Sequence, residues 1–194
     1  AMPPARRARL VVTVHDLSWR VLPDAFPRRG RNWHEHALRR LVGSQAVVVV
    51  SSKEVGQELV RAGVGTKRIS VIPFGSDHLP APDHIAAEKL LAGLGVNDGF
   101  LLCVGTVEPR KNLERLFDAY TRARGRLADD WPLVVAGPSG WGGGVGPRAG
   151  VVMAGPVDGA VLAGLYAKAR LLAYVPLLEG YGFPPLEAMR MGTP

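Results

Sequence analysis

Two glutamates lie on either side of a short glycine-containing segment. Glu179 and Glu187 are separated by seven residues, and Pro184 stands where a helix is expected to begin. A helix N-terminus presents free backbone N–H groups and the positive end of the helix dipole, which suits a phosphate group. Carboxylates repel phosphate, so we expect the two glutamates to accept hydrogen bonds from hydroxyl groups beside it. A diphosphate with hydroxyls on both sides is the chemistry of a sugar nucleotide.

The same two glutamates allow other interpretations. Glu187 could simply stabilise the first turn of its helix while Glu179 lies on the surface. The pair could also be the acid and base of glycoside hydrolysis, because a spacing in sequence does not give the distance between carboxyl groups. Metal binding is not favoured, because no histidine or aspartate joins the glutamates within the segment.

Two cations stand between a predicted strand at 100–104 and a predicted helix that begins near Leu113. Arg110 and Lys111 therefore lie beside a second helix N-terminus, where the dipole disfavours positive charge. A bound diphosphate would explain their placement, whereas the simpler alternative is a solvated basic pair. His15 follows another predicted strand and precedes Asp16. It is either a buried histidine satisfied by the backbone or a donor to a substrate hydroxyl.

Apolar runs alternate with helical patterns along the chain, which predicts an α/β fold with parallel sheets. A turn-rich segment divides the pattern into a first domain at 1–79, a linker at 80–97 and a second domain at 98–194. Ligands of such sheets bind beyond the carboxyl ends of the strands, where His15, Lys111 and Glu179 all stand. The expected strands are 9–14, 46–50, 69–72, 100–104, 132–136, 150–153 and 171–175, and the expected helices are 33–42, 51–62, 86–94, 113–123 and 158–169.

Two loops are predicted with less structure. Residues 23–31 contain two prolines and a glycine, and residues 137–146 are rich in glycine. The second loop has neither a Gly-Lys-Ser/Thr ending nor a G-x-G-x-x-G order, so we do not expect a nucleotide phosphate loop there. It is also short for the crossover of a parallel pair, which usually contains a helix.

Composition limits the classes of partner and compartment. The net charge is +7, with arginine clusters that include Arg6, Arg7 and Arg9, so the surface should attract phosphorylated substrates or anionic lipid headgroups. Nucleic acid is not expected, because no aromatic residues are interleaved with the arginines. The lone cysteine, Cys103, fits a buried apolar strand in a reducing, cytoplasmic compartment. No apolar run approaches the roughly 18 residues of a membrane span.

Together these segments resemble glycosyltransferase family 4 (GT4), whose retaining enzymes have the GT-B fold of two Rossmann-like domains facing a cleft. Residues 179–189, Glu-Gly-Tyr-Gly-Phe-Pro-Pro-Leu-Glu-Ala-Met, are similar to the family's E-x7-E signature. The Glu-Pro-Arg-Lys-Asn sequence within 105–113 resembles the mannosyltransferase-like branch. Further similar segments are 12–17, 50–52, 72–77 and 192–194. Many members carry arginine where Thr106 stands. The resemblance is to the central part of such an enzyme, so both domains are expected to be incomplete.

The resemblance implies a role for each motif in donor binding and transfer. Arg110 and Lys111 would hold the donor diphosphate, with Gly105 on the same loop, and Glu187 would bind the ribose hydroxyls. Glu179 would contact the transferred sugar, which His15 would face from the other domain. The backbone amides of the loop before the helix would cradle phosphate; its residues are Gly180, Tyr181, Gly182 and Phe183.

The resemblance implies a metal-independent, cofactor-free transferase with its site in the interdomain cleft. It would move a hexose from a nucleotide sugar to a polysaccharide, glycolipid or lipid-linked acceptor. GDP-mannose is the first donor that the resemblance suggests, and a UDP-sugar is the second. The protein would be cytoplasmic, with peripheral contact to the anionic inner face of the membrane left open. A non-catalytic nucleotide-sugar-binding or structural fragment is the alternative, and an epimerase or phosphorylase-like enzyme comes third.

Overall fold

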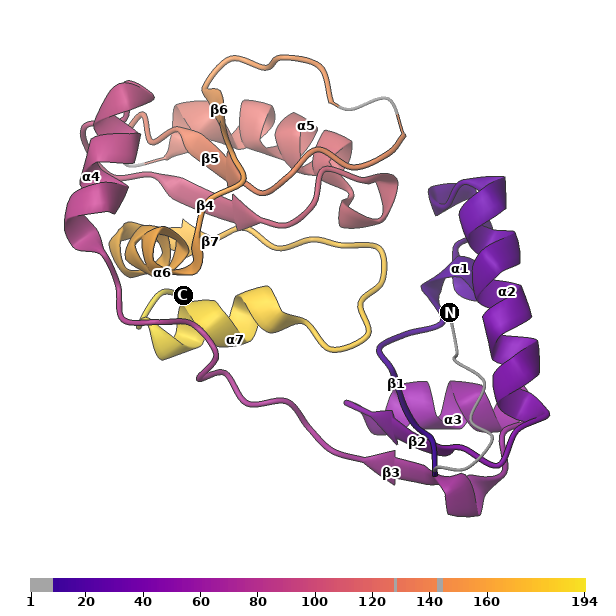
Figure 1. Cartoon of the computed structure of the whole chain (residues 1–194). Coiled ribbons are helices and arrows are strands. Elements are labelled where there is room, and N and C mark those ends of the chain that lie inside the picture. Colours follow the sequence, from indigo (N-terminus) through magenta and orange to yellow (C-terminus); the bar gives the residue numbers. More distant parts are fainter. Residues whose placement is uncertain (1–8, 128, 143–144) are drawn as a thin grey trace. The chain divides into compact units, whose positions relative to one another are not determined.

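A computed structural model describes residues 9–127, 129–142 and 145–194. Arg6 and Arg7 of the first arginine cluster lie outside the described residues. The chain divides into two compact units (Figure 1). The first contains the chain up to Phe74 together with Leu178–Tyr181, and the second contains Gly75–Leu177 and Gly182–Pro194.

The first unit is built on a three-stranded parallel sheet in the order β1-β2-β3, with Val12 paired to Val48. Val48 and Val50 are fully buried and share a core with Leu38 and Leu59 from two of the helices. Ser52 accepts a hydrogen bond from the backbone N–H of Val55 and so caps the second of these helices. The elements are β1 (Val11–Val14), α1 (Ser18–Val21), α2 (Arg28–Val42), β2 (Val47–Val50), α3 (Lys53–Arg61) and β3 (Ile69–Val71), with 3-10 turns at Pro23–Ala25 and Thr66–Arg68.

One sequence prediction for this unit is wrong in detail. The helix predicted at 33–42 begins earlier, at Arg28, within the segment 23–31 that was predicted as a loop. Its first turn follows Pro27 and is polar, so no apolar periodicity indicates it. An uninterrupted run of valines is typical of a strand covered on both faces. Val47 is nevertheless 41% exposed, so β2 buries chiefly the side chains of Val48 and Val50.

The second unit is a four-stranded parallel sheet in the order β6-β5-β4-β7, covered by helices on both faces. Alternate residues of β4 serve the two cores: Leu101 and Cys103 pack with α5, whereas Leu102 packs with α4, α6 and α7. The elements are α4 (His84–Gly93), β4 (Leu101–Val104), α5 (Leu113–Ala123), β5 (Leu133–Ala136), β6 (Val151–Gly155), α6 (Gly159–Lys168), β7 (Leu171–Leu172) and α7 (Phe183–Arg190), with 3-10 turns at Pro109–Lys111 and Arg124–Arg126.

Helix α4 lies within residues 80–97, the segment that the sequence indicates as the linker. Its Ala87 is fully buried and packs against α6, where a side chain at Gly164 would lie 2.8 Å from the Ala87 Cβ. Asp83 caps α4 by accepting from the N–H of Ala86. Because α4 contributes to the core of the second unit, this helix is part of that unit rather than a free connection.

Strands β5 and β6 pair in parallel although the chain between them is short. The described residues between Ala136 and Val151 contain no helix. Strand β7 is shorter than the predicted 171–175. Beyond its last paired residue, Leu172, the Ala173 N–H still donates to Leu102 O, and Val175 O accepts a hydrogen bond from the Asn112 side chain. Within the described part of the chain, no helix combines the length and apolar character needed to cross a bilayer.

Candidate functional site

The loops that follow β4 and β7 meet at one edge of the second unit's sheet. These two strands are direct neighbours in the sheet, so their carboxyl ends lie together. The Asn112 side-chain amide donates to Val175 O at 2.9 Å, and the Leu177 N–H donates to Arg110 O at 2.9 Å. The basic loop and the loop that leads to the two glutamates are therefore held to each other. Asn112 has a left-handed backbone with φ of 60°, and its side chain donates to Val175 O rather than capping α5.

The two predicted cations have different surroundings. The Arg110 guanidinium forms an ion pair with Glu108 at 2.8 Å, and the side chains are only 15% and 4% exposed, respectively. Lys111 extends past Gly105, where an added Cβ would lie 3.0 Å from the lysine Cε. The Lys111 ammonium lies 5.8 Å from the centre of the Tyr174 ring, a weak cation–π contact. The charge of Arg110 is thus balanced by a buried carboxylate, which the sequence analysis did not foresee.

Helix α7 begins where the glycine and proline pattern predicts. Gly182 is its N-cap and has φ of 87°, a left-handed conformation that favours glycine. Phe183 is the first helical residue, and the two prolines that follow carry no N–H group. A side chain at Gly182 would lie 3.7 Å from the Tyr174 hydroxyl, so the start of α7 and Lys111 both border Tyr174.

The Glu187 carboxylate has side-chain partners on both of its oxygens. Glu187 is 6% exposed, and its carboxylate accepts from the Tyr166 hydroxyl at Oε2 and contacts His78 Nε2 at Oε1, both at 2.7 Å. Tyr166 is fully buried on α6, and burial together with the adjacent carboxylate raises its pKa above the ordinary value. The tyrosine is therefore a neutral donor. His78 also packs edge-on against Phe183, with 4.9 Å between ring centres.

The first unit contains the remaining predicted site residues, which are His15, Glu179, Gly180 and Tyr181. His15 is exposed, so it is not the buried histidine of the alternative interpretation, and its ring lies 5.7 Å from that of Phe74. The Tyr181 hydroxyl donates to Phe74 O at 2.6 Å, and the two rings meet edge to face. A side chain at Gly180 would overlap the backbone oxygen of His15 and lie 2.9 Å from the Asp16 Cβ. Only glycine fits there.

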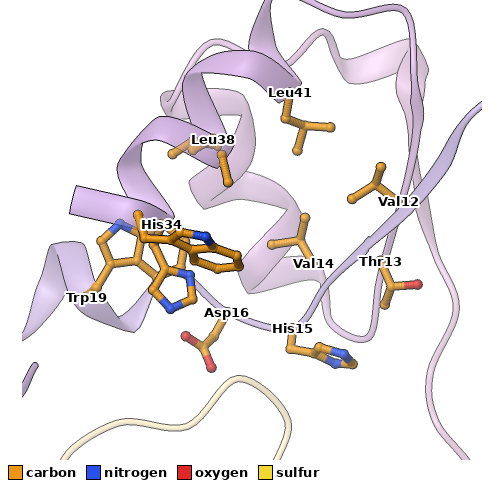
Figure 2. A pocket seen from close by; sticks show the side chains of 11 residues that line it. Val12, Thr13, Val14, His15, Asp16, Trp19, His34, Leu38 and Leu41 are labelled. Atoms are coloured by element: carbon orange, nitrogen blue, oxygen red, sulfur yellow. The ribbon is translucent and has the colours of Figure 1, made fainter. Parts of the chain in front are cut away.

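A pocket of about 420 Å³ lies beside His15 and Asp16 in the first unit. Figure 2 shows the side chains of β1 along one wall and Leu38 and Leu41 of α2 along the other. The Trp19 and His34 rings stack at 4.6 Å, and burial lowers the pKa of His34 although Asp16 opposes the shift. The wall is mostly apolar, with polar groups at the end that carries Asp16.

Two residues at the site were missed by sequence reasoning. Tyr166 lies in an apolar helical stripe, where a tyrosine hydroxyl needs a buried partner, and that requirement was the available signal. His78 lies 109 residues from Glu187 along the chain, so no local pattern pairs them. Among the described residues, no group of three or more His, Cys, Asp or Glu side chains could hold a metal ion.

Comparison with known families assigns most of the chain. Residues 92–194 match the family described as Glycosyl transferases group 1, and residues 1–78 match Glycosyltransferase Family 4. The resemblance read from the motifs is therefore confirmed. The α/β class with parallel sheets of the GT-B type is confirmed as well, since the solved structures below share this fold.

Among curated proteins, the chain is 31% identical to the O-antigen chain mannosyltransferase B of Escherichia coli over 98% of the chain. It is 27% identical to the lipopolysaccharide core biosynthesis mannosyltransferase LpsB of Rhizobium meliloti over 90% of the chain. The chain spans 53% and 50% of the lengths of these two proteins.

Among solved structures, Anabaena Alr3699/HepE in complex with UDP and glucose matches 96% of the chain with a TM-score of 0.70 and 20% identity. WaaG, a glycosyltransferase involved in lipopolysaccharide biosynthesis, matches 97% with a TM-score of 0.71 and 19% identity. The chain covers 52% and 59% of these structures. At these identities the likeness concerns the fold.

Proposed function

Because this chain belongs to the group 1 family of glycosyl transferases, we propose that it carries the donor-binding part of an enzyme that transfers a hexose from a nucleotide sugar to a glycan or glycolipid acceptor. Mannose from GDP-mannose is the first donor we propose. Curated relatives named as mannosyltransferases support it, and one of them is 31% identical. A UDP-sugar is the second, because a neighbour of similar fold was solved with UDP and glucose.

The observation that carries the proposal is the joined pair of loops at the carboxyl ends of β4 and β7. This arrangement places Lys111 and the N-terminus of α7 near the same tyrosine, Tyr174. A cation beside a helix N-terminus suits a diphosphate group. In this proposal Lys111 and Arg110 are the two cations for the diphosphate, and Arg110 also forms an ion pair with Glu108.

We propose further roles for the two glutamates and for His15. Glu187 accepts hydrogen bonds from the ribose hydroxyls, and Glu179 and His15 contact the transferred sugar. The lysine and the helix dipole stabilise the charge that develops on the leaving diphosphate, so the reaction needs no metal ion. Attack from the front face of the sugar, with the departing phosphate taking the acceptor proton, would retain the anomeric configuration.

The setting of the reaction is part of the proposal. The lone cysteine, Cys103, is buried and free, as befits a reducing cytoplasmic compartment. The net charge of +7 would favour contact with the anionic lipids that carry glycolipid acceptors.

The test is nucleotide release from GDP-mannose and UDP-glucose by the full-length protein, with and without a mannose-terminated oligosaccharide. We expect GDP to be released from GDP-mannose only when the acceptor is present. Glu179→Ala should abolish release while the far-UV circular dichroism spectrum stays unchanged. If neither donor releases its nucleotide, whether or not the acceptor is present, the proposed transfer is rejected. Full turnover by Glu179→Ala would reject the role of that carboxylate.

A further inference from the structure

The carboxylate of Glu187 is held from two sides by side chains that no sequence motif links to it. We propose that His78 and Tyr166 are positioning residues. They orient Glu187 so that its carboxylate can accept hydrogen bonds from both hydroxyls of a ribose vicinal diol. This inference rests on the proposed function, because it assigns the ribose of the donor nucleotide to Glu187. It adds two residues to the site and a reason for the geometry of the carboxylate.

Tyr166 supplies the fixed side of the arrangement. Its side chain is fully buried on α6, and its hydroxyl donates to Oε2 of Glu187 at 2.7 Å. Thr193 anchors the same turn of α6 from the other direction, because its hydroxyl donates to the Tyr166 backbone oxygen. A phenol that donates to the carboxylate from this buried position orients it.

His78 supplies the adjustable side. Its Nε2 lies 2.7 Å from Oε1 of Glu187, and its side chain is 44% exposed. A carboxylate only accepts hydrogen bonds, so Nε2 carries the hydrogen in this contact. The ring also packs on Phe183, which lies one turn before Glu187 on α7. His78 therefore spans one turn of α7 and fixes the carboxylate relative to the start of the helix.

The two contacts leave acceptor capacity on both oxygens. A carboxylate has about four lone-pair directions, two on each oxygen. Tyr166 uses one direction on Oε2 and His78 uses one on Oε1, so each oxygen keeps one for another donor. Neighbouring hydroxyls of a ribose supply two donors at matching separation. If His78 is removed, the carboxylate can rotate about its last bond, and only one of the two ribose contacts is then held in place.

Calorimetric titration of the chain with GDP and with 2′,3′-dideoxy-GDP tests this assignment, because the second nucleotide lacks the diol. We expect His78→Ala and Tyr166→Phe each to weaken GDP binding about tenfold and to change dideoxy-GDP binding by less than about twofold. His78→Gln should restore most of the GDP affinity, since its amide can donate from a similar position. His84→Ala, at an exposed histidine of α4, is the matched control and should leave both affinities unchanged.

The outcomes separate the inference from the proposed function. If His78→Ala weakens both nucleotides by the same factor, the histidine acts only through the fold and the inference is wrong, while the proposed function stands. If the unaltered chain binds GDP no better than dideoxy-GDP, the ribose is not held at Glu187 and the inference is equally wrong. If the unaltered chain binds neither nucleotide, both the proposed function and the inference fail.

Discussion

The Nε2 atom of His78 lies 2.7 Å from Oε1 of Glu187, although 109 residues separate them along the chain. The contact ties the segment that follows β3 to the middle of α7. It also completes a hydrogen-bonded group in which the fully buried Tyr166 holds the other carboxylate oxygen. Such groups stabilise a fold only while every member has its partner.

Removal of the Glu187 carboxylate should therefore cost stability through Tyr166. Glu187→Ala leaves the fully buried tyrosine hydroxyl without its acceptor, and we expect the free energy of unfolding to fall by about 1–3 kcal/mol. In a Tyr166→Phe background the same substitution should cost clearly less. Urea unfolding of the four proteins in this double-mutant cycle measures the difference. Strictly additive costs would show that the two side chains are not coupled.

Gly180 should tolerate no larger residue. A Cβ there overlaps the backbone oxygen of His15, which cannot move aside as a flexible side chain would. We expect Gly180→Ala to lower the free energy of unfolding by about 1–3 kcal/mol. Gly30→Ala is the control, because a Cβ at that position in α2 meets nothing within 4 Å and alanine should gain up to about 1 kcal/mol of helix propensity. Equal effects of the two substitutions would contradict the close packing at Gly180.

Lys111 and Arg110 should both contribute to diphosphate binding. Each cation lies on the loop after β4 at the proposed site, so we expect Lys111→Gln and Arg110→Gln each to weaken inorganic pyrophosphate binding about tenfold or more. Competition of pyrophosphate against a fluorescent nucleotide measures both. An unchanged affinity in either variant would contradict the role that we propose for that cation.

The Cys103 thiol should make the protein less stable at high pH. Burial raises its pKa from the ordinary 9.0 to about 11, although the charge of Lys111 opposes the shift. The folded state keeps the thiol proton while the unfolded state loses it, so stability is complete below pH 9 and is lost as the pH rises toward 11. The full effect is about 3 kcal/mol, at 1.36 kcal/mol for each pKa unit.

Urea unfolding of the unaltered protein and of Cys103→Ala between pH 8 and about pH 11 isolates this effect. Other groups titrate in both proteins, so the difference between the two curves reports the thiol alone. That difference should shrink steadily above pH 9. A constant difference across the range would mean that the thiol ionises equally easily in both states.

The sequence supports much of the fold because its strands are continuous apolar runs. The run at 100–104 alternates between the two cores in the structure, so its uniform apolar character follows directly from burial on both faces. The early start of α2 was not predictable, since residues 28–32 are polar and offer no periodicity. The end of β7 was missed because the apolar run 171–175 continues beyond the last strand residue, Leu172.

The site was predictable only where its chemistry is local. Gly182 as the left-handed start of α7 could be read from the glycine and proline spacing, and the meeting of the two loops from the rule for parallel sheets. The pairing of Arg110 with Glu108 was also within reach, since the two residues are two positions apart. His78 could not be found, because only the tertiary structure brings it to Glu187.

The central claim is that the loops after β4 and β7 form a binding site for the diphosphate of a nucleotide sugar. Calorimetric titration of GDP and of UDP into the chain tests it most directly. We predict saturable binding of one nucleotide per chain, tighter for GDP, with a marked loss of affinity in Lys111→Gln. The absence of saturable heat with either nucleotide, from a chain whose circular dichroism shows it to be folded, would contradict the claim.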